Sequence, residues 1–292
     1  MSRSEGFTEE RARAVLEAAD GTAAARRAEL LSLGENAVFA RDDVVVRVGR
    51  DAELLPRARR ELGVAEWLEK ENVPAVRAAE PVARLVEGHP VSYWRRLPPS
   101  VRPATPTDLA ALLRRVHALP EPPVALPRRE LLSGVERWLR LAGDAVRDED
   151  ADFLRERRDA IEARLPTLVP HLPPGPVHGD ALPRNVHVGP DGPLLLDLET
   201  FSSDLREHDL VVMVLSHDRY GLADDAFTGF VETYGWDVRE WDGCATLRAA
   251  RETASCAWVS QHAPGNPAAR REFDRRVASL REGADEVRWY PF

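Results

Sequence analysis

Lysine is almost absent from this chain of 292 residues, because Lys70 is the only lysine among 40 basic residues. Any step that needs a fixed cation must therefore use arginine or Lys70. Arginine stays charged at ordinary pH values and offers a planar fork of hydrogen-bond donors. The formal net charge is −9, and no basic stripe offsets the repulsion of phosphates, so the composition argues against nucleic acid as a partner.

Cysteine and long apolar runs are scarce as well. Cys244 and Cys256 are the only cysteines, and their spacing in a helical stretch predicts neither a disulfide framework nor a metal site. Apolar runs such as residues 194–196 and 211–215 fall far short of the ~20 residues that span a membrane. Residues 1–19 are polar and charged, unlike a signal peptide. We therefore expect a cytoplasmic protein without a membrane partner.

Residues 1–97 carry the pattern of a small antiparallel sheet with one inserted helix. β-Branched and aromatic side chains cluster in strand-sized stretches at residues 37–39, 44–48, 81–85 and 90–94. A helix is expected after Pro56, and another over residues 8–19, where Thr8 can cap its start. We interpret residues 1–97 as an N-terminal lobe.

Residues 98–292 predict a second lobe that is mainly helical. Periodic Leu, Val and Ala mark helices over residues 106–118, 130–142, 150–164, 207–217, 222–234, 241–262 and 267–284. Strands first and helices later define an α+β chain with two lobes.

The sharpest chemical signal is a His-Gly-Asp sequence that ends at Asp180, with Asn185 five residues later and Asp197 after an apolar stretch. Short strands are predicted on either side of a turn at residues 189–192, and their pairing would place Asn185 one step from Asp197. An amide oxygen and a carboxylate suit Mg²⁺, which takes few protein oxygens and completes its shell with phosphate. Asp180, on the loop leading into the hairpin, can accept the proton of an attacking hydroxyl.

These motifs resemble the aminoglycoside phosphotransferase family, the branch of the protein-kinase-like fold that contains antibiotic kinases and choline-kinase-like proteins. The resemblance covers about residues 30–215 and includes a Leu-rich helix followed by the sequence His-Ala-Leu-Pro at residues 117–120. It implies a bilobal protein-kinase-like fold in which Asp180 is the catalytic base. It also implies that Asn185 and Asp197 hold Mg²⁺ and that ATP or GTP is the co-substrate.

The resemblance further implies a nucleotide site in the first lobe. Gly34 and Asn36 lie in the segment that resembles the nucleotide-covering turn. Family members use lysine or arginine on the third strand, and Lys70 lies too far along the following helix to fill this role. We therefore expect Arg47 to grip phosphate, with Glu61 as its ion-pair partner. The alternative is a solvated ion pair between strand and helix without a function.

Four residues are expected to support this site. His178 is interpreted as a hydrogen-bonding organiser of the catalytic loop, and Asp209 as an acceptor of the loop's backbone N–H groups. Glu199 either contacts the metal or supports the residues that hold it, and Arg184 adds a cation that can steady phosphate. The sequence departs from the family at Leu198, where an aromatic residue is common, and in the catalytic loop, which lacks the family's usual histidine.

The sequence thus predicts an O-phosphotransferase that acts on a hydroxyl of a small molecule, with an aminoglycoside-like antibiotic as the first hypothesis. Thirteen acidic residues and five arginines lie between Asp197 and Glu252, and this excess would suit a cationic acceptor, although solvated helix faces explain it equally well. One alternative is a kinase of another acceptor: a macrolide, choline, homoserine, a sugar-amine or a peptide hydroxyl. Another is a nucleotide-binding module without catalysis, which the intact Asp180, Asn185 and Asp197 argue against.

Overall fold

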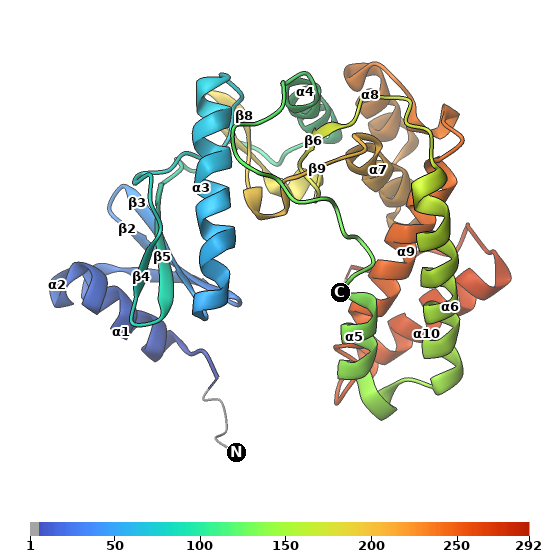
Figure 1. Cartoon of the computed structure of the whole chain (residues 1–292), viewed down its shortest axis with the longest axis horizontal. Helices are drawn as coiled ribbons and strands as arrows, with labels where there is room; N and C mark the ends of the chain where they lie inside the picture. The colour runs from blue at the N-terminus through green and yellow to red at the C-terminus, as the bar shows by residue number, and fades with distance from the viewer. Residues whose placement is uncertain (1–5, 292) are drawn as a thin grey trace. The chain divides into compact units, whose positions relative to one another are not determined.

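The computed structural model describes residues 6–291 and divides the chain into two compact units (Figure 1). The first unit consists of the chain up to Ala104 together with Leu119–Leu126 and Arg184–Phe201. The second consists of Thr105–Ala118, Pro127–Pro183 and the chain from Ser202 onward. The hairpin segment after Pro183 therefore packs with the first unit, although it follows much of the second in sequence. The expected lobes 1–97 and 98–292 stay a prediction.

A five-stranded antiparallel sheet in the order β1-β2-β3-β5-β4 forms the centre of the first unit. Its strands are β1 (Glu29–Leu33), β2 (Asn36–Arg41), β3 (Val44–Gly49), β4 (Arg84–Val86) and β5 (His89–Arg95). The strands predicted at residues 37–39, 44–48 and 90–94 are confirmed, whereas β4 begins later than the predicted residue 81. The sequence does not predict β1, because this edge strand is mostly exposed and shows no alternation of buried residues.

The two faces of this sheet carry different helices, α1 (Glu9–Asp20) followed by α2 (Thr22–Arg27), and α3 (Leu55–Lys70). Val46, Val48 and Tyr93 join the buried side of α1 in one apolar core. Successive strand residues point to opposite faces. Arg47 therefore points to the other face, where it meets Glu61 of α3. The sheet thus separates the apolar core on the α1 side from the Arg47–Glu61 pair on the α3 side.

A two-stranded hairpin completes the first unit. Strands β7 (Val186–Gly189) and β8 (Gly192–Leu195) pair antiparallel with the predicted register, Val188 opposite Pro193. Leu195 is joined to the chain after α3 by two hydrogen bonds, from the Val76 N–H at 2.8 Å and to the Pro74 carbonyl at 3.0 Å. These bonds fix the hairpin to the unit that contains the large sheet.

Helix α9 lies at the centre of the second unit, with α5, α6, α7 and α10 around it (Figure 1). The helices are α4 (Pro106–His117), α5 (Val135–Ala142), α6 (Asp148–Arg164), α7 (Glu207–Tyr220), α8 (Asp224–Tyr234), α9 (Cys244–Ser260) and α10 (Pro267–Glu282). All seven predicted helices are present. The largest shift is at α5, where Gly134, a poor helix former, precedes the first turn. Within residues 6–291, no helix is long and apolar enough to cross a membrane.

Two very short strands lie beside these helices. Strands β6 (Gly175–Val177) and β9 (Ser202–Asp204) pair antiparallel, and β6 leads directly into the loop that carries Asp180. The sequence predicts neither strand, because three residues are too few for a recognisable period. The predicted α+β architecture, a small antiparallel sheet with a mainly helical lobe, is confirmed.

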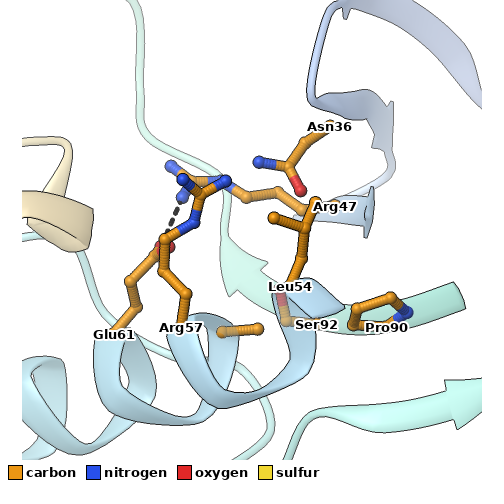
Figure 2. Close-up of a pocket in the computed structure, with 8 residues that line it drawn as sticks. Asn36, Arg47, Leu54, Arg57, Glu61, Pro90 and Ser92 are labelled. Carbon is orange, nitrogen blue, oxygen red and sulfur yellow. Dashed lines mark hydrogen bonds and ion pairs between the residues drawn. The ribbon is translucent and has the colours of Figure 1, made fainter. Parts of the chain in front are cut away.

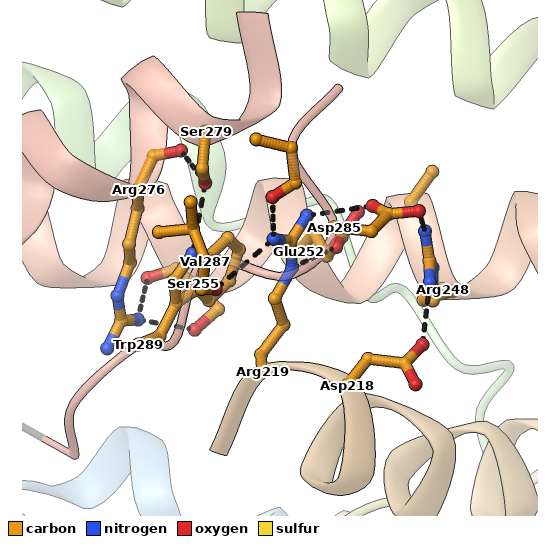
Figure 3. Close-up of polar contacts among 12 residues, drawn as sticks. Asp218, Arg219, Arg248, Glu252, Ser255, Arg276, Ser279, Asp285, Val287 and Trp289 are labelled. Carbon is orange, nitrogen blue, oxygen red and sulfur yellow. Dashed lines mark hydrogen bonds and ion pairs between the residues drawn. The ribbon is translucent and has the colours of Figure 1, made fainter. Parts of the chain in front are cut away.

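The chain after α10 is tied to the helices by arginines (Figure 3). Arg219 of α7 donates to the carbonyl of Ala284 at 2.7 Å, and Arg276 of α10 donates to the carbonyl of Tyr290 at 2.6 Å. The guanidinium of Arg219 lies 4.8 Å and that of Arg276 lies 5.0 Å from a centroid of the Trp289 ring. This last segment is therefore part of the core of the second unit.

Candidate active site

A pocket in the first unit gathers the residues predicted to bind nucleotide. Asn36 of β2, Arg47 of β3 and Glu61 of α3 line it, with Leu54, Arg57, Ala58, Pro90 and Ser92 (Figure 2). Gly34 lies in the turn between β1 and β2, where its N–H donates to the Asn36 carbonyl at 3.0 Å. A β-carbon at Gly34 would meet nothing within 4 Å. The described part of the protein thus leaves the space beside this turn free.

The expected ion pair between Arg47 and Glu61 is present, with Nη1 2.8 Å from Oε2. The Arg47 guanidinium also lies 4.9 Å from the centroid of the Trp94 ring. The Glu61 side chain is 6% exposed and that of Arg47 is 25% exposed. Burial raises the pKa of Glu61 to about 7, although the Arg47 charge opposes this shift. The bond to Glu61 uses one of the five N–H donors of arginine, so the guanidinium can hold a second anion.

Arg57 is a second cation of this pocket, and the sequence analysis missed it. Its side chain extends from α3 toward the same pocket as Arg47 (Figure 2). Nη2 of Arg57 lies 2.8 Å from Glu35 in the β1–β2 turn, and Nε lies 3.8 Å from Glu199. The sequence could have predicted it, because residues four apart share a face of a helix and Arg57 stands four residues before Glu61.

Asn185 and Asp197, the predicted magnesium ligands, lie at the open end of the β7–β8 hairpin. The Leu196 N–H donates to the Asn185 carbonyl at 2.8 Å, which extends the ladder one step beyond the paired strands. Asp197 then leaves the strand with φ of 53°, a left-handed conformation that is uncommon for a residue with a side chain. Asn185 is buried and Asp197 is half-buried. The hairpin thus brings both residues to one end of the same element.

The charges around this hairpin suit a cation. Burial raises the pKa of Glu199, and the charge of Asp197 raises it further. The same two carboxylates also raise the pKa of Glu61, so the three acids repel one another. Within the described residues no cluster of three or more His, Cys, Asp or Glu side chains forms a metal site. Asn185 and Asp197 offer an amide oxygen and a carboxylate, which are the kinds of ligand that magnesium takes alongside phosphate and water.

In the second unit, Asp209 holds the loop that carries Asp180. The N–H groups of His178 and Gly179 donate to the two carboxylate oxygens of Asp209 at 2.7 and 2.8 Å, and His117 Nε2 lies 3.1 Å away. Burial raises the pKa of Asp209, but the contacts with His117, His178 and Gly179 outweigh it, so that this pKa falls to about 2. Asp209 thus accepts the backbone hydrogen bonds that the sequence analysis expected.

The loop itself is tightly shaped. The Asp180 N–H donates to Nδ1 of the buried His178 at 3.4 Å, as an organising role for this histidine requires. Gly179 adopts φ of +86°, which favours glycine over any residue with a β-carbon. Asp180 is half-buried and Arg184 is exposed. A carboxylate in so constrained a loop can orient a hydroxyl and accept its proton.

Arg251 of α9 is another residue that the sequence analysis missed. Its Nη2 donates to the carbonyl of His208 at 2.8 Å and to that of Gly179 at 3.3 Å. The sequence gives no signal for it, because this arginine stands in a long helix and belongs to no recognisable motif.

The excess of acids between Asp197 and Glu252 does not form a free acidic wall. Eight of the thirteen make hydrogen bonds or ion pairs inside the second unit, and these are Asp204, Glu207, Asp209, Asp218, Asp224, Asp225, Asp237 and Glu252. The charge count therefore loses most of its weight as an argument for a cationic acceptor.

A small antiparallel sheet with one long helix, a helical unit, a His-Gly-Asp loop and an Asn–Asp hairpin together define a phosphotransferase with a protein-kinase-like fold. The chain belongs to the phosphotransferase enzyme family known as APH, whose sequence profile matches residues 27–247. The predicted family is thereby confirmed. A search of curated proteins finds no sequence that matches significantly.

Solved structures share the fold at low sequence identity. A choline/ethanolamine kinase family protein from Mesorhizobium loti is 20% identical, with a TM-score of 0.62 over 94% of this chain and 93% of that one. Aminoglycoside phosphotransferase APH(3'')-Id from Streptomyces rimosus is 18% identical, with a TM-score of 0.61 over 82% and 97%. The amicoumacin kinase hAmiN, in complex with AMP-PNP and Ca²⁺, is 11% identical, with a TM-score of 0.67 over 90% of each chain.

Proposed function

We propose that this protein transfers the terminal phosphoryl group of ATP or GTP to a hydroxyl group of a small molecule. The observation that carries the proposal is the Arg47–Glu61 pair, in which a nearly buried carboxylate holds an arginine at the edge of a pocket. Burying an acid beside an arginine contributes little stability by itself. It does fix a guanidinium whose remaining donors match the geometry of phosphate oxygens. Membership of the phosphotransferase family supports this assignment.

The rest of the pocket supplies the nucleotide site. Arg47 and Arg57 would bind the phosphates, Glu61 would position Arg47, and the turn at Gly34 and Asn36 would cover the nucleotide. The free space beside Gly34 allows a ligand to approach this backbone closely.

Asn185 and Asp197 would hold magnesium. Glu199 would assist them, because it is near enough to Asp197 for the Asp197 charge to raise its pKa. When bound, magnesium neutralises the negative charge that develops on the phosphates during transfer. Arg184, which is exposed beside Asn185 in sequence, would steady the phosphate.

Asp180 would orient the acceptor hydroxyl and take its proton. The hydroxyl oxygen forms a bond to the terminal phosphorus while the bond to the bridging oxygen breaks, so that the nucleoside diphosphate leaves and the proton passes to the carboxylate. Asp180 and Asn185 are five residues apart and can be separated by no more than ~17 Å of extended chain. His178 and Asp209 hold the loop that carries the base.

An aminoglycoside-like antibiotic remains our first hypothesis for the acceptor. Phosphorylation of such an antibiotic in the cytoplasm would make the cell resistant to it. The similar structures include an aminoglycoside phosphotransferase, and APH(3'')-Id has also been solved with ADP and streptomycin. They also include choline kinase LicA from Streptococcus pneumoniae, so a different small alcohol is the alternative.

The test is transfer of labelled phosphate from ATP and from GTP to a panel of aminoglycosides, macrolides, choline, homoserine and sugar-amines, with Mg²⁺ present. We expect one class of acceptor to be labelled and the Asp180→Ala variant to transfer at least ~10²-fold more slowly, because it lacks the general base. Nucleotide binding by this variant should be unchanged. Near-normal transfer by a well-folded Asp180→Ala protein would remove Asp180 from the role of base.

The metal assignment has its own test. Asp197→Asn should weaken the binding of magnesium-nucleotide while binding of nucleotide without metal changes little, because only the metal contact is lost. If titration calorimetry gives the same affinity for magnesium-nucleotide with both proteins, Asp197 does not hold the metal.

A further inference from the structure

Three arginines are buried in the second unit, and one of them differs from the others. Arg219 is 1% exposed and lies 2.8 Å from Glu252 (Figure 3). Arg276 is 2% exposed and lies 2.8 Å from Glu272. Arg251 is 8% exposed and has no carboxylate within 4.0 Å in the described chain. Within residues 6–291, its hydrogen bonds go to backbone carbonyls alone.

Such an arrangement is unfavourable for the stability of the fold. Burial lowers the pKa of Arg251 to about 10, and the nearby charge of Arg129 lowers it further, against the attraction of Asp209 and Asp180. Its Nε is buried without a hydrogen-bond partner. A buried charge without a close partner destabilises a protein, and an apolar residue would pack in α9 at less cost. The reason for this arginine must therefore lie in what it contacts.

The contacts of Arg251 fall on the catalytic loop and on the helix that anchors it. One bond goes to the carbonyl of Gly179, which precedes Asp180, and the other to the carbonyl of His208, which precedes Asp209. Asp209 in turn accepts the N–H of Gly179 at 2.8 Å. Both backbone polar groups of Gly179 are therefore held by side chains of the helical core, the N–H by α7 and the carbonyl by α9.

These two hydrogen bonds matter because glycine has more backbone freedom than any other residue, and Gly179 stands directly before the proposed catalytic base. Its φ of +86° lies in a region that glycine enters and leaves freely. Rotation of the peptide between Gly179 and Asp180 would swing the carboxylate away from the acceptor hydroxyl. A base that is misplaced by about 1 Å loses on the order of 10²-fold in rate.

We propose that Arg251 is a positioning residue, which fixes the peptide between Gly179 and Asp180 and thereby aims the catalytic carboxylate. This inference rests on the proposed function, because it assumes that Asp180 is the base. Arg251 itself touches neither nucleotide nor acceptor in this assignment. It acts through the carbonyl of Gly179, whereas Asp209 acts through the N–H of the same residue.

The test compares Arg251→Met with Arg276→Met. Both variants lose a buried arginine of the second unit and keep an unbranched side chain, but Arg276 contacts Glu272, Ser255 and the carbonyl of Tyr290, away from the loop. We expect Arg251→Met to lower kcat for phosphoryl transfer about 10- to 100-fold, with KM for the nucleotide within about twofold of the parent. Arg276→Met should keep kcat at a temperature where both are folded.

Hydrogen–deuterium exchange of residues 178–182 supplies a readout that does not depend on activity. Arg251→Met should speed exchange in this segment, and Arg276→Met should not. Arg251→Lys, which keeps the charge and can donate to a carbonyl, should recover part of both kcat and protection; if Arg251→Met does not fold, this variant decides. Unchanged kcat, or unchanged loop exchange, in a folded Arg251 variant would overturn the inference. If the parent transfers no phosphate to any acceptor, the proposed function fails, while the exchange experiment still decides whether Arg251 holds the loop.

Discussion

Two arginine–glutamate pairs in this protein have the same contact distance and opposite surroundings. Arg47 lies 2.8 Å from Glu61 in the first unit, and Arg219 lies 2.8 Å from Glu252 in the second. Arg219 is 1% exposed and Arg47 is 25% exposed. The distance between two charges therefore says little about their role, which depends on the other groups that meet them.

The pair in the second unit is closed on all sides. Arg219 also donates to the carbonyl of Ala284 and contacts Asp285, and its guanidinium stacks on the Trp289 ring (Figure 3). Every one of these partners belongs to the protein, so the network fastens the C-terminal segment to α7 and α9. Few donors of this network remain for a ligand, so its role is to stabilise the fold.

The pair in the first unit is open on one side. Arg47 faces a pocket, and burial together with neighbouring carboxylates raises the pKa of Glu61 to about 7. Glu61 is therefore hard to ionise, and Arg47 beside it has hydrogen-bond donors to spare. We call this an incomplete arrangement, because a phosphate could take the spare donors and a metal ion could offset the neighbouring carboxylates. The difference between the pairs separates a structural network from the nucleotide site that we propose.

The largest expected effect comes from breaking the closed pair. Arg219→Met should lower the free energy of unfolding by about 3–5 kcal/mol, because Glu252 stays buried with less compensation. Urea unfolding followed by tryptophan fluorescence measures this. The activity of the fraction that remains folded should be unaffected, and a loss below about 1 kcal/mol would show that this network does not fasten the segment.

The next effect is a pH dependence of stability caused by Glu61. Its pKa is raised from 4.5 to about 7 in the folded protein, so the folded state binds the proton more tightly than the unfolded chain. The resulting stabilisation is present below pH 4.5 and is lost as pH rises through 7. Glu61→Gln should remove about 3 kcal/mol of this dependence, measured as melting temperature against pH.

Glu66→Gln provides the matched control for that experiment, because Glu66 stands on the same helix and is 58% exposed. Its pH profile should follow that of the parent. If Glu61→Gln also follows the parent, Glu61 is ionised in the folded protein across this range and the interpretation of the pocket as an incomplete arrangement is wrong.

Opening the first pair fully should affect ligand binding more than folding. Arg47→Ala should weaken nucleotide binding about 10- to 100-fold, as loss of a charge-assisted phosphate contact does. Arg47→Lys should restore only part of the affinity, because lysine loses the two-pronged contact. Calorimetric titration with magnesium-nucleotide measures both, and unchanged affinity in Arg47→Ala would leave the pair as an ion pair without a function.

The smallest effect is expected from the exposed pair of α3. Lys70 lies 2.6 Å from Glu66, with side chains 68% and 58% exposed. Exposed pairs of this kind contribute about 0–1 kcal/mol, so Lys70→Ala should change stability within that range and leave phosphoryl transfer unaltered. A loss of transfer in Lys70→Ala would return the nucleotide cation to the only lysine and remove it from Arg47.

Much of the fold could be predicted because its signals are local. The seven helices of the second unit have clear apolar periods, and the hairpin register at Val188 and Pro193 follows from strand length and turn position. The three-residue strands β6 and β9 could not be predicted, because each is too short to show a period and pairs with a partner far away in sequence. The edge strand β1 pairs with its neighbour β2 but is mostly exposed and shows no alternation of buried residues.

The sequence by itself determined the family and supplied the hypothesis for the catalytic and binding residues, since Asp180, Asn185 and Asp197 stand at fixed spacings and the scarcity of lysine singles out Arg47. Only the tertiary structure decided which charged side chains have partners within the protein. It gave eight of the thirteen acids between Asp197 and Glu252 partners inside the second unit, placed Arg57 beside Arg47, and brought Arg251 from α9 to the carbonyl of Gly179. The physical reason is that the effect of a charge depends on burial and on partners far away in sequence, which a local pattern does not contain.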